Sequence, residues 1–352
     1  MESILHAIDT EEWRAGHKLP SENEMIDLYG VGRNTIREAL LKLESNGIIY
    51  RRQGKGTFYS GKRFPSENRT FLIGVVMPQH YFFSEVIQGI DEESTKHRYH
   101  ILLSNNRRGS VSDETYIREI VGKGVDGLLY LPVGTPGEEE IFSWIEPLDI
   151  PVVILSWKLN RNNFSFVTLD DRHGGYMATA HLLKTGHRRI AFVGLGGHVP
   201  SKDRYQGYRQ ALEEHGLSTD PSIETWIPTA EPGRFSEEAE SLTRKLLVDA
   251  GPGGLDSVFF MSDSAALAGY RAIKGMGLSI PEDISVVGFD DSELASHAAP
   301  PLTTVLYPKF ELGKLAAAAL FDQIEEGANS LARQVVLQPR IRIRESVSER
   351  KP

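Results

Sequence analysis

Short apolar runs alternate with amphipathic stretches over most of the chain. The runs are rich in β-branched and aromatic residues, and segments of helix length separate them: FLIGVVM, HILLS, DGLLYL, PVVILS, FVTL, RIAFVG, SVFFMS and ISVVGF. Continuous apolar strands of this kind are typical of parallel sheets that helices cover on both faces. The pattern predicts an α/β fold with two lobes and a ligand site where loops converge at the carboxyl ends of the strands.

The first sixty residues instead show the periodicity of two short helices. Residues 19–22, Leu-Pro-Ser-Glu, place a hydroxyl at the N-cap and acids in the first turn of a helix over 22–29. Residues 30–32 end this helix, and a second helix is predicted over 33–45. Its apolar residues recur at the spacing of a buried stripe: Ile36, Ala39, Leu40 and Leu43. Two short helices joined by a glycine turn form a helix-turn-helix.

A predicted hairpin follows the second helix. Two β-rich runs, over 48–52 and 57–59, flank a glycine turn with Lys55 at its tip. A basic hairpin after a recognition helix is a wing. In such a domain the start of the recognition helix reaches base edges in the major groove, and the wing holds phosphates or enters the minor groove.

The distribution of charge agrees with this interpretation. The sequence carries a formal net charge of −9, but residues 33–63 hold eight basic residues against Glu38 and Glu44. A basic strip beside an acidic body directs a protein to a phosphate backbone and limits non-specific binding. Charge alone leaves a second interpretation open, a solvated basic surface with no nucleic-acid partner.

The segment LPSENEMIDLYGVGRNTIREALLKLESNGIIYRRQGKGTF resembles the winged helix of the GntR family, and the resemblance covers residues 2–60. It implies a DNA-binding domain over 1–60 with these contact residues: Ser21, Glu22, Asn23, Arg33, Asn34, Thr35, Arg37, Gln53, Gly54 and Lys55. Gly32 stands where the family usually has a serine, which removes one hydroxyl from this surface. The domain's first helix would begin almost at Met1, so either that helix is short or the start lies upstream. A winged helix used only for protein contact is the alternative.

The rest of the chain resembles a second family. Residues 61–69 are polar and broken by Gly and Pro, as in a linker. Residues 70–352 resemble the effector-binding and dimerisation domain of the LacI/GalR family, which has a two-lobed, periplasmic-binding-protein-like fold. The motifs that carry this resemblance are VDGLLYLP, LDDRHGGYMATAHLLKTGHRRIAFVG, DRYQGYRQAL, SVFFMSDSAALAGYRAI, IPEDISVVGFDDSELA and PPLTTV.

This second resemblance implies an effector site lined by Phe83, Ser84, Trp157, Arg204, Phe235, Ser262 and Asp290. Arg204 and Asp290 offer donors and acceptors to sugar hydroxyls, and aromatic side chains cover the apolar face of a sugar ring. Ser262 stands where asparagine or aspartate is common in the family, which leaves the identity of the ligand open. For each residue a purely structural role is the alternative: an ion pair for the charged residues and core packing for the aromatic ones.

The two resemblances together imply a transcriptional regulator that is not an enzyme. It is expected to be a cytoplasmic homodimer that represses carbohydrate-utilisation genes from double-stranded operator DNA and is released by a small sugar such as L-arabinose. A regulator that responds to a purine or another non-sugar ligand is the first alternative, because the same lobes accommodate nucleobases in related regulators. A sugar-processing α/β enzyme fused to a regulator head is the second alternative.

Enzyme, cofactor and metal motifs are incomplete in this sequence. Gly194 and Gly196 end an apolar run as in a dinucleotide-binding fingerprint, but Val199 occupies the position of its third glycine. The Gly-Lys pair of the wing lacks the spacing of a P-loop. H-E-x-x-H and G-x-S-x-G do not occur, and only His97 and His100 approach a ligand spacing. We therefore expect no catalytic residues, no cofactor and no metal site.

Cysteine usage and hydropathy bear on location. The sequence has no cysteine, which excludes disulfides and Cys-ligated zinc. No apolar run approaches the roughly 20 residues of a membrane span. The N-terminal segment MESILHAIDTEEW is acidic rather than basic, unlike a secretory signal. These features favour the cytosol and no membrane partner.

Overall fold

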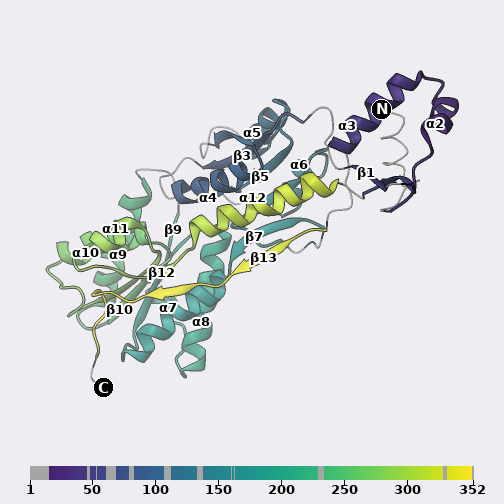
Figure 1. The fold of residues 1–352 in the computed structure, drawn as a ribbon. Coiled ribbons are helices and arrows are strands. Elements are labelled where there is room, and N and C mark those ends of the chain that lie inside the picture. The colour runs from purple at the N-terminus through teal and green to yellow at the C-terminus, as the bar shows by residue number, and fades with distance from the viewer. Residues whose placement is uncertain are drawn as a thin grey trace. The chain divides into compact units, whose positions relative to one another are not determined.

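The computed structural model (Figure 1) describes residues 16–45, 48–52, 54–60, 69–78, 83–106, 112–132, 138–159, 161, 163–228, 234–327 and 331–350. The chain forms two compact units, residues 1–71 with 321–331 and residues 72–320 with 332–352. Four sequence predictions concern segments outside the described residues: the helix expected to begin near Met1, Gln53, the end of the second helix at 46–47, and most of the linker.

The smaller unit contains the predicted helix-turn-helix. Ser21 is the N-cap of the helix over 22–29 and forms a capping box, in which its Oγ accepts from the Glu24 amide at 3.4 Å and the Glu24 carboxylate accepts from the Ser21 amide at 2.7 Å. Gly30 ends this helix with a φ of 64°, a left-handed conformation that glycine adopts at little cost. The elements are α2 (Glu22–Tyr29), α3 (Arg33–Ser45), β1 (Ile49–Arg52) and β2 (Gly56–Tyr59).

The predicted hairpin and buried stripe are confirmed. Strands β1 and β2 pair antiparallel, with Ile49 opposite Tyr59 and Arg52 opposite Gly56. The apolar face of α3 packs with residues of α2 and of the hairpin in one buried cluster: Leu19, Met25, Ile36, Ala39, Leu40, Leu43, Ile48, Ile49 and Tyr59. Because the cluster draws on α2, α3, β1 and β2, it fixes α3 against the wing.

The larger unit contains two six-stranded sheets, as the apolar runs predict. The first has the strand order β13-β7-β6-β5-β3-β4, and all of its pairs are parallel. Its strands are β3 (Leu72–Pro78), β4 (His100–Asn106), β5 (Gly127–Tyr130), β6 (Val152–Leu155), β7 (Ser165–Leu169) and β13 (Gln334–Leu337). Between them the chain forms α4 (Ser84–Lys96), α5 (Asp113–Val121) and α6 (Glu138–Ile145).

The second sheet has the strand order β14-β12-β11-β10-β8-β9, and its pairs are parallel except that β14 runs antiparallel to β12. Its strands are β8 (Ile190–Leu195), β9 (Glu224–Ile227), β10 (Ser257–Phe260), β11 (Ser285–Asp290), β12 (Thr303–Leu306) and β14 (Arg340–Arg342). Its helices are α7 (Asp171–Lys184), α8 (Val199–Glu214), α9 (Arg234–Ala250), α10 (Asp263–Gly275) and α11 (Glu293–His297), followed by α12 (Lys309–Glu326).

The C-terminal stretch takes part in both sheets. Strand β13 pairs with β7 of the first sheet, and β14, only a Gln338-Pro339 dipeptide later, pairs with β12 of the second. These are the two yellow arrows in Figure 1. The chain therefore leaves the first sheet after β7, at 169–171, and enters the second sheet. It returns to the first sheet through α12 and crosses to the second sheet again between β13 and β14.

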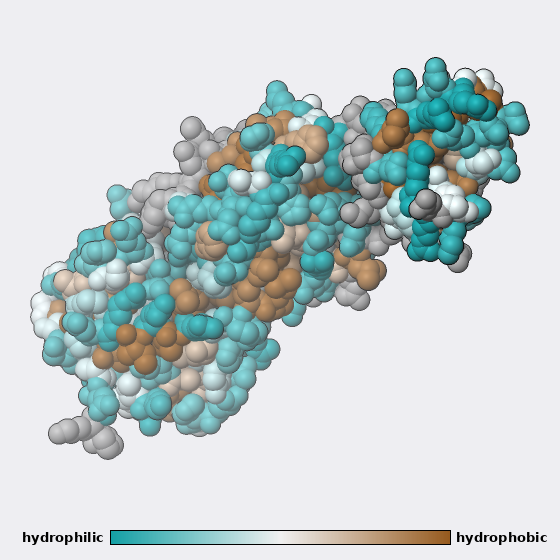
Figure 2. Space-filling view, in the orientation of Figure 1, coloured by the Kyte–Doolittle hydropathy of each residue, from teal (hydrophilic) through white to brown (hydrophobic). Residues whose placement is uncertain are grey.

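Six inner strands, β5, β6, β7, β8, β10 and β11, are buried along their whole length, as their continuous apolar sequences require. Hydrophilic side chains cover much of the face seen in Figure 2. Within the described ranges no helix is both long enough and apolar enough to span a bilayer.

Candidate functional site

Two contacts between helices assemble the predicted DNA-contact residues of the smaller unit. Arg37 on α3 forms an ion pair with Glu22 on α2, with 3.2 Å between Nε and Oε2. Arg33 donates from Nη2 to Oδ1 of Asn23 at 2.8 Å. Because both contacts join the start of α2 to the first half of α3, residues that lie ten to fifteen positions apart in the sequence share one surface.

The first half of α3 exposes its polar residues and buries its apolar ones. Arg33, Asn34, Thr35 and Arg37 are exposed, whereas Ile36 is buried. The hydroxyl of Ser21 is engaged with Glu24 in the helix cap, so its present role is structural. The exposed side chains are those that can donate to base edges and phosphates.

The wing presents basic residues on a braced hairpin. Gly54 and Lys55 are exposed at the turn, and Gly54 has a φ of 73°. The Tyr50 and Phe58 rings stack with centroids 5.7 Å apart, and the Arg52 guanidinium lies over both. These contacts hold the hairpin in shape while Lys55 stays open to a phosphate.

In the larger unit, close packing of α7 against α8 brings Arg204 to Asp171. A Cβ atom at Gly175 would clash with the backbone of Arg204, and one at Gly207 would clash with the backbone of Arg172. Only glycine at these two positions permits so short a distance between the helices. The motifs that contain these glycines, DDRHGGY and DRYQGY, also carry the charged pair: Asp171 is the first residue of α7 and Arg204 is the sixth residue of α8.

Arg204, one of the predicted effector residues, is 4% exposed. Its Nε donates to Oδ1 of Asp171 at 2.7 Å. Its Nη1 donates to the Met261 carbonyl and lies 3.6 Å from Oδ1 of Asp290. The guanidinium stacks on Phe289, 3.5 Å from the ring centroid. The structure thus brings Arg204 and Asp290 together, as the sequence predicts.

Asp290 ends β11 in an unusual backbone conformation. Its φ is 113°, and that of the next residue, Asp291, is 47°. Residues other than glycine rarely adopt such values, and they persist only where the surrounding structure enforces them. The Asp290 carbonyl accepts from Nζ of Lys309 at 2.9 Å, and the same ammonium lies 3.4 Å from Oε1 of Glu85. A buried lysine therefore links the end of β11 to helix α4.

Burial raises the pKa of both carboxyl groups around Arg204. For Asp290 the pKa rises from 3.8 to about 8, because loss of solvent outweighs the attraction of Arg204 and Lys309. For Asp171 it rises to about 6 for the same reason, although the ion pair with Arg204 opposes the change. Burial lowers the pKa of Arg204, but attraction to the two carboxylates outweighs this and leaves it above its ordinary value.

We expect the contribution of Asp290 to the free energy of unfolding to fall as the pH rises. The pKa in the folded state, about 8, exceeds the ordinary value of 3.8, so this contribution is fully present below 3.8 and is lost as the pH rises through about 8. Asparagine at this position does not titrate. Urea unfolding at about pH 5 and about pH 8 gives the stability that each protein loses between the two pH values. Other titrating groups contribute equally to this loss in both proteins, so the loss should be smaller in Asp290→Asn than in the parent. Equal losses in the two proteins would contradict the raised pKa.

The other predicted effector residues lie at the starts of helices or in the apolar core. Ser262 is the N-cap of α10, where its Oγ accepts from the Ala265 amide at 3.2 Å. Trp157 is 5% exposed and belongs to the apolar core cluster of the first sheet, with Phe142 and Phe166. The remaining three flank helix starts: Phe83 and Ser84 at α4, and Phe235 at α9. Their part in ligand binding stays a prediction.

Sequence reasoning missed several polar residues beside Arg204. Asp171 follows β7 and begins α7, and an acid directly after an apolar run was the available signal. Tyr307 is buried and its hydroxyl lies 2.6 Å from Oγ of Ser156, joining the end of β12 to the end of β6. Lys309, which is 3% exposed, follows in the same YPKF segment. No group of three acidic or histidine side chains within the described residues could hold a metal ion.

Comparisons with known proteins bear on both units. The model for bacterial regulatory proteins of the gntR family matches residues 1–58, and that for a periplasmic binding protein-like domain matches residues 179–347. The chain is 28% identical to the arabinose metabolism transcriptional repressor of Geobacillus stearothermophilus, over 99% of this chain and 96% of that one. It is 32% identical to the ribose operon repressor of Haemophilus influenzae, over 80% of this chain and 82% of that one. The full-length match confirms that the combination of the two domains resembles that of an arabinose repressor.

Solved structures agree with this placement. The complex of the transcriptional regulator CelR with cellobiose superposes with a TM-score of 0.70 at 27% identity, covering 93% of this chain and all of that one. A LacI family regulator from Enterococcus faecium with bound ribose gives a TM-score of 0.68 at 29% identity, covering 80% of this chain and all of that one. The named relatives are transcriptional repressors and not enzymes. The chain therefore belongs to the LacI-type transcriptional repressors and carries a GntR-family helix-turn-helix at its N-terminus.

Proposed function

We propose that this repressor acts in the cytoplasm as a homodimer on a pseudo-palindromic operator of carbohydrate-utilisation genes, and that a monosaccharide bound beside Arg204 releases it. The observation that carries the proposal is the buried arginine between Asp171 and Asp290, stacked on Phe289. The residues around Arg204 offer hydrogen-bond donors, acceptors and an aromatic face. A site for a small polyhydroxylated ring requires these three features. The dimer follows from the small size of one winged helix, which alone buries too little surface for high specificity.

L-Arabinose is the first ligand to test. The relative from Geobacillus stearothermophilus that matches nearly the whole chain is named for arabinose metabolism. Other similar proteins are named for ribose or are complexed with ribose or cellobiose, so identity alone does not select one sugar. The test is a thermal-shift screen of the full chain with L-arabinose, D-ribose, cellobiose and adenine, followed by operator release measured by fluorescence anisotropy. Release by adenine and by none of the sugars would replace the proposal with a nucleobase-responsive repressor.

We expect two substitutions in the smaller unit to weaken DNA binding in different ways. Arg37→Ala should lower specific affinity by about 1–3 kcal/mol and relax one base preference, because we propose that its guanidinium, exposed on α3, contacts a base edge. Lys55→Ala should weaken binding to all sequences alike and flatten the dependence of affinity on salt, because it meets phosphate. The measurement is anisotropy titration of operator and scrambled DNA at several salt concentrations.

The matched control for both is Lys96→Ala, which removes one exposed positive charge from α4 of the larger unit. Its affinity and salt dependence should equal those of the parent. Parental operator affinity in both Arg37→Ala and Lys55→Ala would show that α3 and the wing do not contact DNA as proposed.

A further inference from the structure

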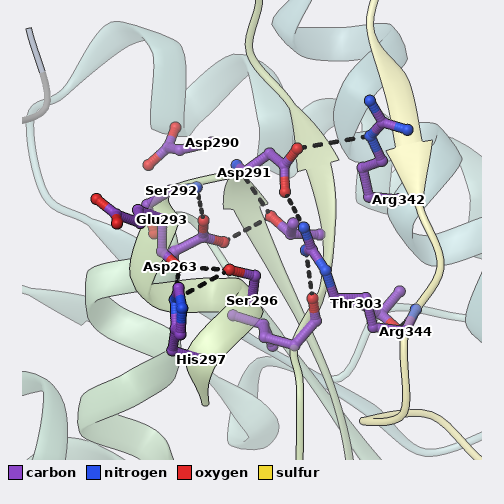
Figure 3. A network of polar contacts seen from close by, with 12 residues as sticks. Asp263, Asp290, Asp291, Ser292, Glu293, Ser296, His297, Thr303, Arg342 and Arg344 are labelled. Atoms are coloured by element: carbon purple, nitrogen blue, oxygen red, sulfur yellow. Dashed lines mark hydrogen bonds and ion pairs between the residues drawn. The ribbon is translucent and has the colours of Figure 1, made fainter.

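The segment that carries Asp290 is held by its neighbours at three consecutive residues. Asp290 is fixed through its carbonyl, which accepts from Lys309 at 2.9 Å. Asp291 is fixed through its carboxylate, whose Oδ1 accepts from Nη2 of Arg344 at 2.6 Å. Ser292 is fixed through its amide, which donates to Oδ2 of Asp263 at 2.6 Å. Figure 3 shows the contacts of Asp291 with Arg344 and of Ser292 with Asp263, with the carboxylates of Asp290 and Asp291 directed to opposite sides.

Thr304 on the adjacent strand β12 closes the network. Its hydroxyl accepts from the Asp291 amide at 3.4 Å and donates to Oδ1 of Asp263 at 2.6 Å. Asp263 is 1% exposed, and Gly288 leaves room for its carboxylate, because a Cβ atom there would clash with Oδ1. The Asp263 carboxylate accepts hydrogen bonds from the Ser292 amide and the Thr304 hydroxyl, and these two bonds hold the backbone after β11 in register with β12.

Arg344 joins this network from the C-terminal part of the chain. It lies beyond the end of β14, where its Nη1 donates to the Leu302 carbonyl at 2.9 Å and its Nη2 to Asp291. Its side chain is 21% exposed and that of Asp291 is 13% exposed, so solvent only partly screens the pair. Arg342 also approaches Asp291, at 3.6 Å, but its side chain is 61% exposed and its contribution should be small.

We propose that Arg344, acting through Asp291, is a positioning residue for the effector site: the ion pair holds the left-handed backbone of 290 and 291 so that the Asp290 carboxylate faces Arg204. This inference deepens the proposed function and rests on it, since it assigns Asp290 to ligand binding. The physical reason is that neither aspartate adopts a positive φ without cost. Anchoring the Asp291 side chain on one face of the segment fixes the direction of the Asp290 side chain on the other.

The first test needs no ligand. Hydrogen exchange of the peptide over 286–296 is measured by mass spectrometry in the full chain. In Arg344→Ala the amides of 290–292 should exchange about tenfold faster than in the parent, because the anchor is lost. The matched control is Arg340→Ala, an exposed arginine on β14, which should exchange as the parent does. Parental exchange at 290–292 in Arg344→Ala would overturn the proposal.

The second test uses L-arabinose and calorimetry. Arg344→Ala should bind about tenfold more weakly than the parent, and Arg344→Lys should recover part of the loss because it keeps the charge but not both hydrogen bonds. In an Asp290→Asn background, Arg344→Ala should change the affinity less than about twofold, since the residue acts through Asp290. A tenfold loss in that background as well would show that Arg344 acts elsewhere.

The two tests separate the two proposals. If the parent binds none of the sugars while Arg344→Ala still loosens 290–292, the assignment of a sugar ligand fails and the positioning contact stands. If the parent binds L-arabinose and Arg344→Ala binds it equally well, the sugar assignment stands and the positioning role fails.

Discussion

Arg204→Ala should lower the free energy of unfolding by about 3–5 kcal/mol, the range found when one partner of a buried ion pair is removed. The alanine leaves the Asp171 carboxylate buried without its cation, leaves the Met261 carbonyl without a donor, and removes the packing on Phe289. The measurement is urea unfolding followed by circular dichroism and by tryptophan fluorescence. Two probes are needed because a unit with two sheets need not unfold in a single step.

Two companion variants make this result specific. Arg209→Ala removes an exposed arginine from the same helix, whose partner Glu213 is also exposed, and should cost less than about 0.5 kcal/mol. Asp171→Asn added to Arg204→Ala should recover part of the lost stability, because the uncompensated buried charge is then gone. If the double variant is no more stable than Arg204→Ala, packing on Phe289 and not charge dominates the role of Arg204.

Asp290→Asn should produce a repressor that binds its operator but no longer responds to the effector. At a pH above about 8, where the Asp290 carboxyl group is ionised, the substitution preserves shape and removes one charged acceptor from the site beside Arg204. Loss of a hydrogen bond involving a charged group costs on the order of 1.5–3 kcal/mol, which is roughly a tenfold to hundredfold loss of effector affinity. Because an effector shifts DNA affinity only by its differential affinity for the two forms of the protein, release of DNA weakens with it.

The measurement combines calorimetry with L-arabinose and operator release by anisotropy on the same preparation. The matched control is Asp249→Asn, an exposed acid on α9, which should respond as the parent does. Operator affinity without sugar should be parental in both variants. Parental sugar affinity in Asp290→Asn would mean that Asp290 serves only the ion pair with Arg204.

Local periodicity was sufficient for most of the fold. The α3 stripe of Ile36, Ala39, Leu40 and Leu43 is buried, because a 3.6-residue repeat determines which face of a helix packs. Seven of the eight apolar runs became inner strands, because burial on both faces demands continuous hydrophobicity, and the run HILLS became the edge strand β4. The sequence did not predict the short edge strands β13 and β14. Their four and three residues alternate between exposed and half-buried, and so short a pattern cannot be distinguished from a loop.

The candidate site was accessible from sequence only in part. Arg204 and Asp290 lie in motifs that a family resemblance identifies. The contact between Asp171 and Arg204, however, joins residues 33 positions apart and depends on the close packing of α7 and α8 at their glycines. The positive φ of Asp290 is likewise set by contacts from Lys309 and from the segment around Arg344, and no local rule predicts it for an aspartate. Long-range contacts of this kind depend on tertiary packing that periodicity does not specify.

The position of β13 has a consequence for how the chain acquires its fold during synthesis. The strand that covers β7 is made from residues 334–337, so on a ribosome the outer edge of the first sheet stays unpaired while the whole second sheet up to β12 emerges. An open edge on a fully buried strand such as β7 is a template for pairing with another nascent chain. The two lobes therefore cannot fold to completion independently, one after the other. Both are completed in the same late step, when the segment that carries β13 and β14 leaves the exit tunnel.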